Sequence, residues 1–182
     1  MLDFLVPFTA IAVAEFGDKT QLSILLLSSQ TKERLQLFIG LMLAFLVVDG
    51  IAVLAGSWAT NIIPTHIVKI ASALLFIVIG AMLFCGKIDE ERTIPKFQCP
   101  FVSGFLLIFI AEWGDKTQMA AGIFATIYNP LLVLIGTLAA LGLISLIALY
   151  FGGLVSHKIE RRMLAKLSGI VFILIGLSAF LF

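Results

Sequence analysis

Charged residues are scarce in this sequence. Asp, Glu, Lys and Arg make up 13% of its 182 residues and hydrophobic residues 61%, whereas about a quarter of a soluble domain is charged. With a mean hydropathy of +1.15, this composition excludes a soluble domain of any size and indicates a polytopic helical membrane protein. The net charge of +1 and the lack of a basic run give no indication of a nucleic-acid partner.

Cysteine and histidine are equally rare. Cys85 and Cys99 flank one loop without a Cys-x-x-Cys spacing, so we interpret them as ordinary thiols. His66 and His157 fall in predicted connections, where we expect solvated side chains. Soft metals such as Zn²⁺ and Cu⁺ are therefore disfavoured within the membrane. An intramembrane hydrolase is also disfavoured, because no His-Glu-x-x-His run or Ser–His pairing is present.

Long apolar runs, in contrast, fill most of the chain. Each has roughly the 17–25 residues that a helix needs to cross a bilayer, and helices satisfy their backbone hydrogen bonds internally. No cleavable signal peptide is expected, since the first residues lack a basic region. We predict six transmembrane helices near Phe4–Ser28, Leu35–Trp58, Ile67–Phe84, Phe101–Ile127, Leu131–Leu154 and Met163–Phe182.

One charged stretch occurs twice inside these apolar runs. Residues 14–21 read Ala-Glu-Phe-Gly-Asp-Lys-Thr-Gln, and residues 111–118 repeat seven of the eight positions, with Trp113 in place of Phe16. Ionised groups at the bilayer centre cost about 2.5–3.5 kcal/mol each on insertion scales. Buried ion pairs that only fix helix register are the alternative, but two matching copies favour a single functional site.

The repeat extends beyond this motif. At an offset of 96 residues, Gly40 and Gly56 align with Gly136 and Gly152, and Phe76 aligns with Phe172. The chain is therefore predicted to consist of a first three-helix repeat (1–85), a cytoplasmic linker (86–100) and a second three-helix repeat (101–182). Because three is odd, the second repeat must enter the membrane from the opposite side, as in many secondary transporters.

Basic residues predict the orientation. Nine of them lie in connections on one side, one (Lys69) lies on the other, and the remaining two are in the motifs. The positive-inside rule then places both termini outside. Glu15 and Glu112 each lie about 16 Å into their helices from opposite faces, close to the middle of a core about 30 Å thick. We expect one midplane site between the repeats.

The predicted site is rich in oxygen atoms. On an ideal helix the Glu, Asp and Lys of each motif share one face, while Gly17 and Gly114 weaken the helix and could let the backbone open. Four carboxylates and two ammoniums leave a charge of −2, which one divalent cation such as Mg²⁺, Ca²⁺ or Mn²⁺ would balance. The predicted metal ligands are Glu15, Asp18, Gln21, Glu112, Asp115 and Gln118.

Several polar residues are predicted to support the site. Lys19 and Lys116 either pair with the carboxylates while no metal is bound or extend away from them. Thr20 and Thr117 would turn inward if the backbone opens. Asp49, which aligns with Ser145, is interpreted as a counter-ion to a motif lysine, a proton relay or a ligand. A buried Glu could carry a proton when the metal leaves.

The paired Glu-x-Gly-Asp-Lys-Thr motifs, the three-plus-three layout and the charged central loop resemble the calcium:cation antiporter-2 family. This family includes Golgi transmembrane manganese/calcium transporters and bacterial manganese exporters. The resemblance covers the whole chain, and both copies match the pattern. It implies export of Mn²⁺ or Ca²⁺ from the cytoplasm in exchange for protons, with Glu15, Asp18, Glu112 and Asp115 as the functional acids. It further implies a bacterial plasma (inner) membrane.

The sequence thus favours a divalent cation/proton antiporter, not an enzyme, and no cofactor is predicted. Its expected partners are the cation, protons and the lipid bilayer, with homo-oligomerisation left open. A passive channel or an exporter of another small solute is the main alternative, and an accessory subunit is a lesser one. Inverted repeats with titratable midplane ligands favour alternating access over a channel.

Overall fold

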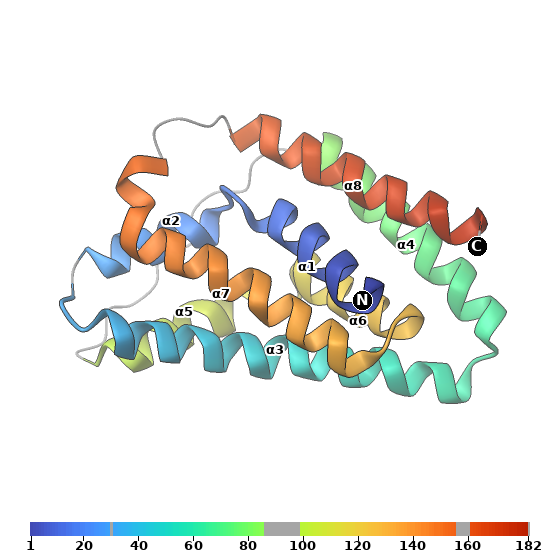
Figure 1. The fold of residues 1–182 in the computed structure, drawn as a ribbon, viewed down its shortest axis with the longest axis horizontal. Coiled ribbons are helices and arrows are strands. Elements are labelled where there is room, and N and C mark those ends of the chain that lie inside the picture. The colour runs from blue at the N-terminus through green and yellow to red at the C-terminus, as the bar shows by residue number, and fades with distance from the viewer. Residues whose placement is uncertain (30, 86–98, 156–160, 182) are drawn as a thin grey trace.

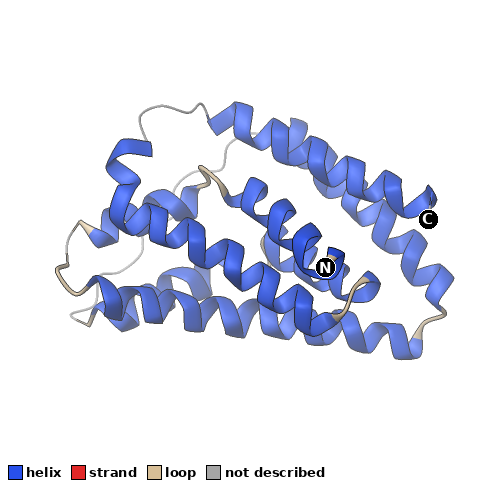
Figure 2. Ribbon diagram, in the orientation of Figure 1, coloured by secondary structure: helices blue, strands red, loops and turns tan. Residues whose placement is uncertain are grey.

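The computed structural model describes residues 1–29, 31–85, 99–155 and 161–181. Within these ranges every regular element is an α-helix and no strand occurs (Figure 2). The predicted all-α fold class is therefore confirmed. Most of the predicted linker, residues 86–98, and the C-terminal Phe182 lie outside the described residues.

The helices follow the predicted apolar segments, with one difference. The first and fourth segments are each split at the motif, so that two shorter helices replace one (Figure 1). The break falls at Gly17 and Gly114, where the sequence had left an opening of the helix as one possibility. The described helices are α1 (Leu2–Glu15), α2 (Lys19–Ser28), α3 (Arg34–Ile62), α4 (Thr65–Cys85), α5 (Pro100–Glu112), α6 (Lys116–Ile127), α7 (Pro130–Val155) and α8 (Arg161–Leu181).

Local sequence explains where several helices begin. Pro100 and Pro130 are the first residues of α5 and α7, a position where proline loses no helical hydrogen bond. Just before α7, the side-chain oxygen of Asn129 accepts hydrogen bonds from the backbone N–H groups of Leu131 (3.1 Å) and Leu132 (3.3 Å). Such a cap satisfies amides that the first helical turn leaves without partners.

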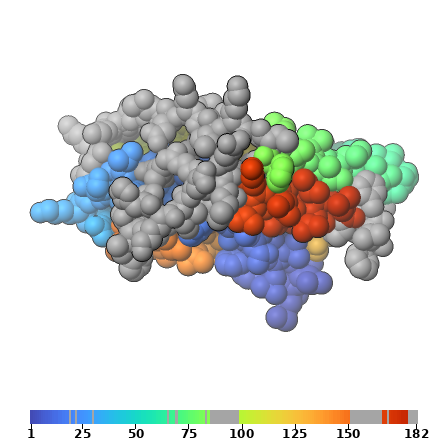
Figure 3. Space-filling model, turned by 90° about the horizontal axis from the view of Figure 1, so that it is seen from above, coloured from blue at the N-terminus to red at the C-terminus, as the bar shows by residue number. Residues whose placement is uncertain are grey.

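The two sequence repeats interlock. Helices α1 and α2 of the first repeat pack on α7 of the second, while α5 and α6 of the second pack on α3 of the first. Helices α4 and α8 form the most extensive pair, and they lie side by side in the space-filling view (Figure 3). Most helix packing is therefore between the repeats, which brings the two motifs together.

Small residues make these crossings close. A Cβ atom at Gly40 of α3 would lie 2.1 Å from the backbone oxygen of Phe101, and one at Gly136 of α7 would lie 2.7 Å from that of Phe4. These contacts are equivalent in the two repeats. The aligned glycines therefore permit close helix packing at both positions.

Apolar side chains lie both inside and outside the helix bundle. Phe76, Phe124 and Phe172 are fully buried and join α4, α6 and α8, with ring centroids 4.7 Å apart for Phe76–Phe124 and 5.8 Å for Phe76–Phe172. Many large apolar side chains are exposed, including Leu54 and Leu74. Such a surface is typical of contact with lipid.

Two described helices, α3 and residues 130–150 of α7, are long and apolar enough by themselves to cross a membrane. The structure is thus consistent with a membrane protein, while six spans remain a prediction. Both termini lie toward the end of the molecule that carries the α3–α4 and α6–α7 connections (Figure 1). The α2–α3 connection lies at the opposite end.

Candidate cation-binding site

Each motif folds into a tight turn between two helices. Phe16 and Trp113 have extended backbones (φ −65°, ψ 116° and φ −67°, ψ 113°), and each is followed by a glycine with φ +79°. The N–H of Asp18 donates to the carbonyl of Glu15 (3.2 Å), and the N–H of Asp115 donates to that of Glu112 (3.1 Å). These are the features of a type II β-turn, which needs glycine at its third position.

The motif glutamines close these turns. Oε1 of Gln21 accepts a hydrogen bond from the N–H of Gly17, and Oε1 of Gln118 accepts one from the N–H of Gly114, both at 2.7 Å. Both glutamines were predicted as metal ligands. The structure uses their carbonyl oxygens to stabilise the backbone around the site.

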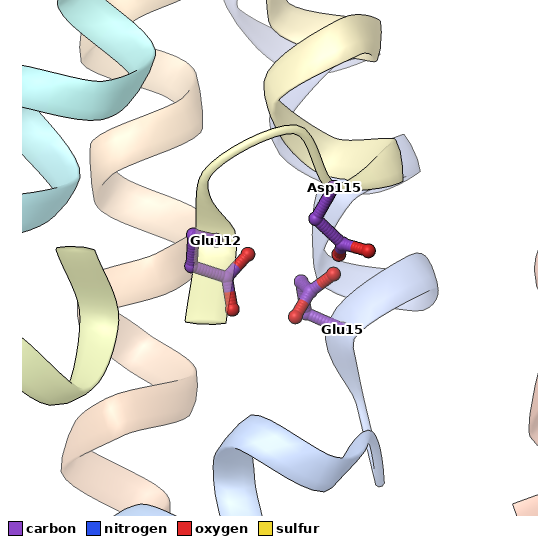
Figure 4. Close-up of side chains that lie close together, drawn as sticks. All are labelled: Glu15, Glu112 and Asp115. Carbon is purple, nitrogen blue, oxygen red and sulfur yellow. The ribbon is translucent and has the colours of Figure 1, made fainter. Parts of the chain in front are cut away.

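The turns bring three carboxylates together, and we call Glu15, Glu112 and Asp115 the acid cluster. One oxygen from each lies within 4.8 Å of the other two, and the side chains point toward one another (Figure 4). Oxygens on opposite sides of one divalent cation are about 4–5 Å apart, so the spacing suits a shared ion. Glu15 and Glu112 are each 3% exposed.

Threonines connect the two motifs reciprocally. The hydroxyl of Thr20 donates to Oε1 of Glu112 (2.7 Å), and the hydroxyl of Thr117 donates to Oε1 of Glu15. Both threonines are buried. Each motif therefore orients the glutamate of the other, with both threonine hydroxyls turned toward the site.

Lys116 forms ion pairs within the same site. Its ammonium lies 2.9 Å from Oε1 of Glu15 and 3.2 Å from Oδ2 of Asp115, and it also contacts Oδ2 of Asp18. Asp18, predicted as a metal ligand, lies outside the acid cluster and pairs with this lysine. The helical position of Lys19 is described, but its side chain is not.

Asp49 of α3 is another buried acid, next in sequence to a residue that contacts the second motif. It is 2% exposed. Next to it, the carbonyl of Val48 accepts a hydrogen bond from Nε2 of Gln118 (3.1 Å). Sequence reasoning missed this role of Val48, because a backbone carbonyl in the middle of an apolar run gives no signal in the sequence.

The family follows from comparison with known proteins. The family model described as "Divalent cation/proton antiporter GDT1" matches residues 3–91 and 100–181, almost the whole chain. The chain belongs to this family. The resemblance noted from the paired motifs is therefore confirmed. The family consists of transporters of divalent cations and not of enzymes, and membership indicates an integral membrane protein.

Relatives within the family occur in bacteria and plants. A Vibrio cholerae protein named "Putative manganese exporter" is 31% identical over 180 residues, which cover 97% of this chain and 90% of the relative. "GDT1-like protein sll0615" of Synechocystis is 26% identical over 196 residues, 93% of this chain and 94% of the relative. "Protein PAM71, chloroplastic" of Arabidopsis thaliana is 26% identical over 201 residues, 93% of this chain but 54% of the relative. No solved structure has a significant match to this chain.

Proposed function

We propose that the protein exports Mn²⁺ or Ca²⁺ from the cytoplasm in exchange for protons, and that the transported cation binds at the acid cluster. One observation carries this proposal: two buried glutamates and an aspartate, drawn from both motifs, hold oxygens within 4.8 Å of one another. Two buried carboxylates beside a partly buried third are unfavourable unless a cation binds them. Oxygen ligands alone suit Mn²⁺, Mg²⁺ or Ca²⁺.

The ligand set that we propose is narrower than the one predicted from the sequence. Glu15, Glu112 and Asp115 bind the cation, because their oxygens converge. Gln21 and Gln118 act by holding the turns, since each carbonyl oxygen accepts a glycine N–H. The remaining coordination positions would be filled by water or by backbone oxygens.

Competition between protons and the cation supplies the coupling. A carboxylate that binds the cation must be ionised, so protonation of the cluster at low pH weakens cation binding and deprotonation at higher pH restores it. Apparent affinity should fall as pH drops, by about tenfold per pH unit for each proton displaced. Protons entering from a more acidic exterior would then release the cation there.

The proposed arrangement in the membrane is six spans, with the two motif helices broken at mid-depth. The repeats, 1–85 and 101–182, have opposite orientations, and both termini face outward from a bacterial inner membrane. The basic-residue asymmetry and the positions of the connections in the fold support this arrangement. A cysteine introduced at Thr31 should react only with cytoplasmic reagent, and cysteines at Asn61 and Asn129 only with external reagent. Labelling of Thr31 and Asn129 from the same side would contradict the inverted repeat.

Transport in proteoliposomes tests the function. Purified protein should move Mn²⁺ or Ca²⁺ against its concentration gradient when an opposing pH gradient is imposed, and collapsing the pH gradient should abolish that accumulation. Liposomes containing the Glu15→Gln variant are the matched control. If the cation flux does not depend on the pH gradient and stops when the concentrations are equal, the protein is a passive channel and not an antiporter.

A further inference from the structure

Lys116 holds the same carboxylates that the cation would bind. Its ammonium lies 2.9 Å from Oε1 of Glu15 and 3.2 Å from Oδ2 of Asp115, two of the three members of the acid cluster. A third partner, Asp18, belongs to the first motif. The lysine thus joins acids of both repeats at the point where the cation would sit.

Charge repulsion makes it unfavourable for the ammonium and a divalent cation to share these oxygens. Divalent cations bind oxygen at about 2.0–2.6 Å, so an ion on Oε1 of Glu15 would lie within about 5.5 Å of the ammonium. The side chain of Glu15 is 4% exposed and that of Lys116 15%, so little water lies between them to screen the repulsion. Oε1 of Glu15 also accepts the hydroxyl of Thr117, which leaves it few free directions.

We propose that Lys116 is an internal competitor for the transported cation. Its ammonium pairs with Glu15 and Asp115 of the acid cluster when no cation is bound, withdraws when a divalent cation arrives, and returns when the cation leaves. This inference rests on the proposed function, because it assumes that the acid cluster is the transport site. No covalent bond forms or breaks in this exchange.

Competition of this kind would set both affinity and charge selectivity. The cluster never has to remain buried with all its carboxylates unpaired, which would be unfavourable. A monovalent ion offers the carboxylates no more charge than the ammonium it must displace, whereas a divalent ion offers twice as much. Lys116 therefore favours Mn²⁺ or Ca²⁺ over Na⁺ and speeds cation release by replacing the ion that departs.

A purely structural role makes the opposite prediction. If Lys116 only ties the two motifs together, removing its charge would let the carboxylates separate, and cation binding would weaken. If it competes, removing its charge would leave the carboxylates free for the cation, and binding would tighten. Transport would fall in both cases, so equilibrium binding and not transport distinguishes the two roles.

The test is a titration of the purified full-length protein with Mn²⁺, following free Mn²⁺ by its electron paramagnetic resonance signal. We expect Lys116→Met and Lys116→Gln to bind Mn²⁺ at least about tenfold more tightly than wild type, and 100 mM NaCl to weaken their binding more than it weakens wild-type binding. Lys116→Arg keeps the charge and should bind no more tightly than wild type.

Lys166→Met is the matched control. It removes one positive charge from α8, where the ammonium lies 5.8 Å from the ring of Phe84, and it should leave Mn²⁺ affinity unchanged. If wild type binds Mn²⁺ and both neutral Lys116 variants bind it equally or more weakly, the competition is overturned while the proposed transport site stands. If neither wild type nor these variants binds Mn²⁺, the proposed transport site fails and the competition fails with it.

Discussion

The two motifs have almost the same sequence and the same backbone, yet they form different contacts. In both, a glycine with φ +79° makes the turn, a glutamine closes it and a threonine reaches the glutamate of the other motif. The amide of Gln118, however, also donates to the carbonyl of Val48, whereas the buried Nε2 of Gln21 has no acceptor among the residues that the structure describes. The two motifs are therefore equivalent within the turn and its threonine contact, but not in their contacts with other helices.

The surroundings explain this difference. Gln118 faces α3, where the carbonyl of Val48 lies 3.1 Å away and Asp49 follows. The position in α7 that aligns with Asp49 is Ser145, which is buried but uncharged. Two copies of one motif thus sit in two different environments.

Neutralising either glutamate should cause the largest loss of cation binding, and the loss should be similar for the two motifs. Glu15→Gln and Glu112→Gln should each reduce Mn²⁺ affinity more than about 100-fold and abolish transport, because changes even in the outer partners of metal ligands cost about 10–100-fold. Binding titrations and proteoliposome flux measure these losses. Near-normal transport by either variant would show that the substituted glutamate does not bind the cation.

Neutralising the two aspartates should have different effects on cation affinity in the two motifs. Asp115 belongs to the acid cluster, while Asp18 lies outside it and contacts Lys116. We expect Asp115→Asn to lower Mn²⁺ affinity by about 100-fold and Asp18→Asn to lower it by less than about tenfold. The same titration, run on both variants in parallel, makes the comparison. Equal losses would mean that the motifs contribute to the site symmetrically.

Glycine substitutions test whether the turn itself matters. Gly114 has φ +79° and a Cβ added there would meet nothing within 4 Å, so Gly114→Ala should be destabilising by about 1–2 kcal/mol through backbone strain alone. Gly50, in helix α3, has equally open surroundings and is the matched control. Gly50→Ala should be neutral or stabilising by up to about 1 kcal/mol. Thermal unfolding in detergent measures the stability of both variants. Similar melting temperatures for Gly114→Ala and Gly50→Ala would contradict a turn that requires glycine.

The smallest expected difference is between the glutamines. Gln21→Met and Gln118→Met both remove the acceptor for a glycine N–H, but only Gln118→Met also breaks the hydrogen bond to Val48. Gln118→Met should therefore be the more destabilising by about 1 kcal/mol. Chemical unfolding of the two variants, with wild type alongside, gives the difference. A larger loss in Gln21→Met would show that its amide has a partner in solution.

Much of the fold could be predicted because its signals are local. Apolar length predicted the helical segments, and the repeated motif predicted that Glu15 and Glu112 lie close together. The sequence left open whether the motif stays helical, and the structure shows a turn because Gly17 and Gly114 stand where a type II turn requires glycine. That signal was present in the sequence, because both copies read Glu-x-Gly, which places glycine at the third position of the turn.

The sequence by itself determined the repeat, the apolar segments, the positions of the two breaks and the acids available for the site, because each depends on residue type or on neighbours along the chain. Only the tertiary structure decided which acids converge, which threonine serves which glutamate and which carboxylates Lys116 holds. The physical reason is the crossed packing of the repeats, in which α1 and α2 lie against α7 while α5 and α6 lie against α3. The threonine–glutamate hydrogen bonds that this packing allows join residues 92 and 102 positions apart, and no local pattern encodes such contacts.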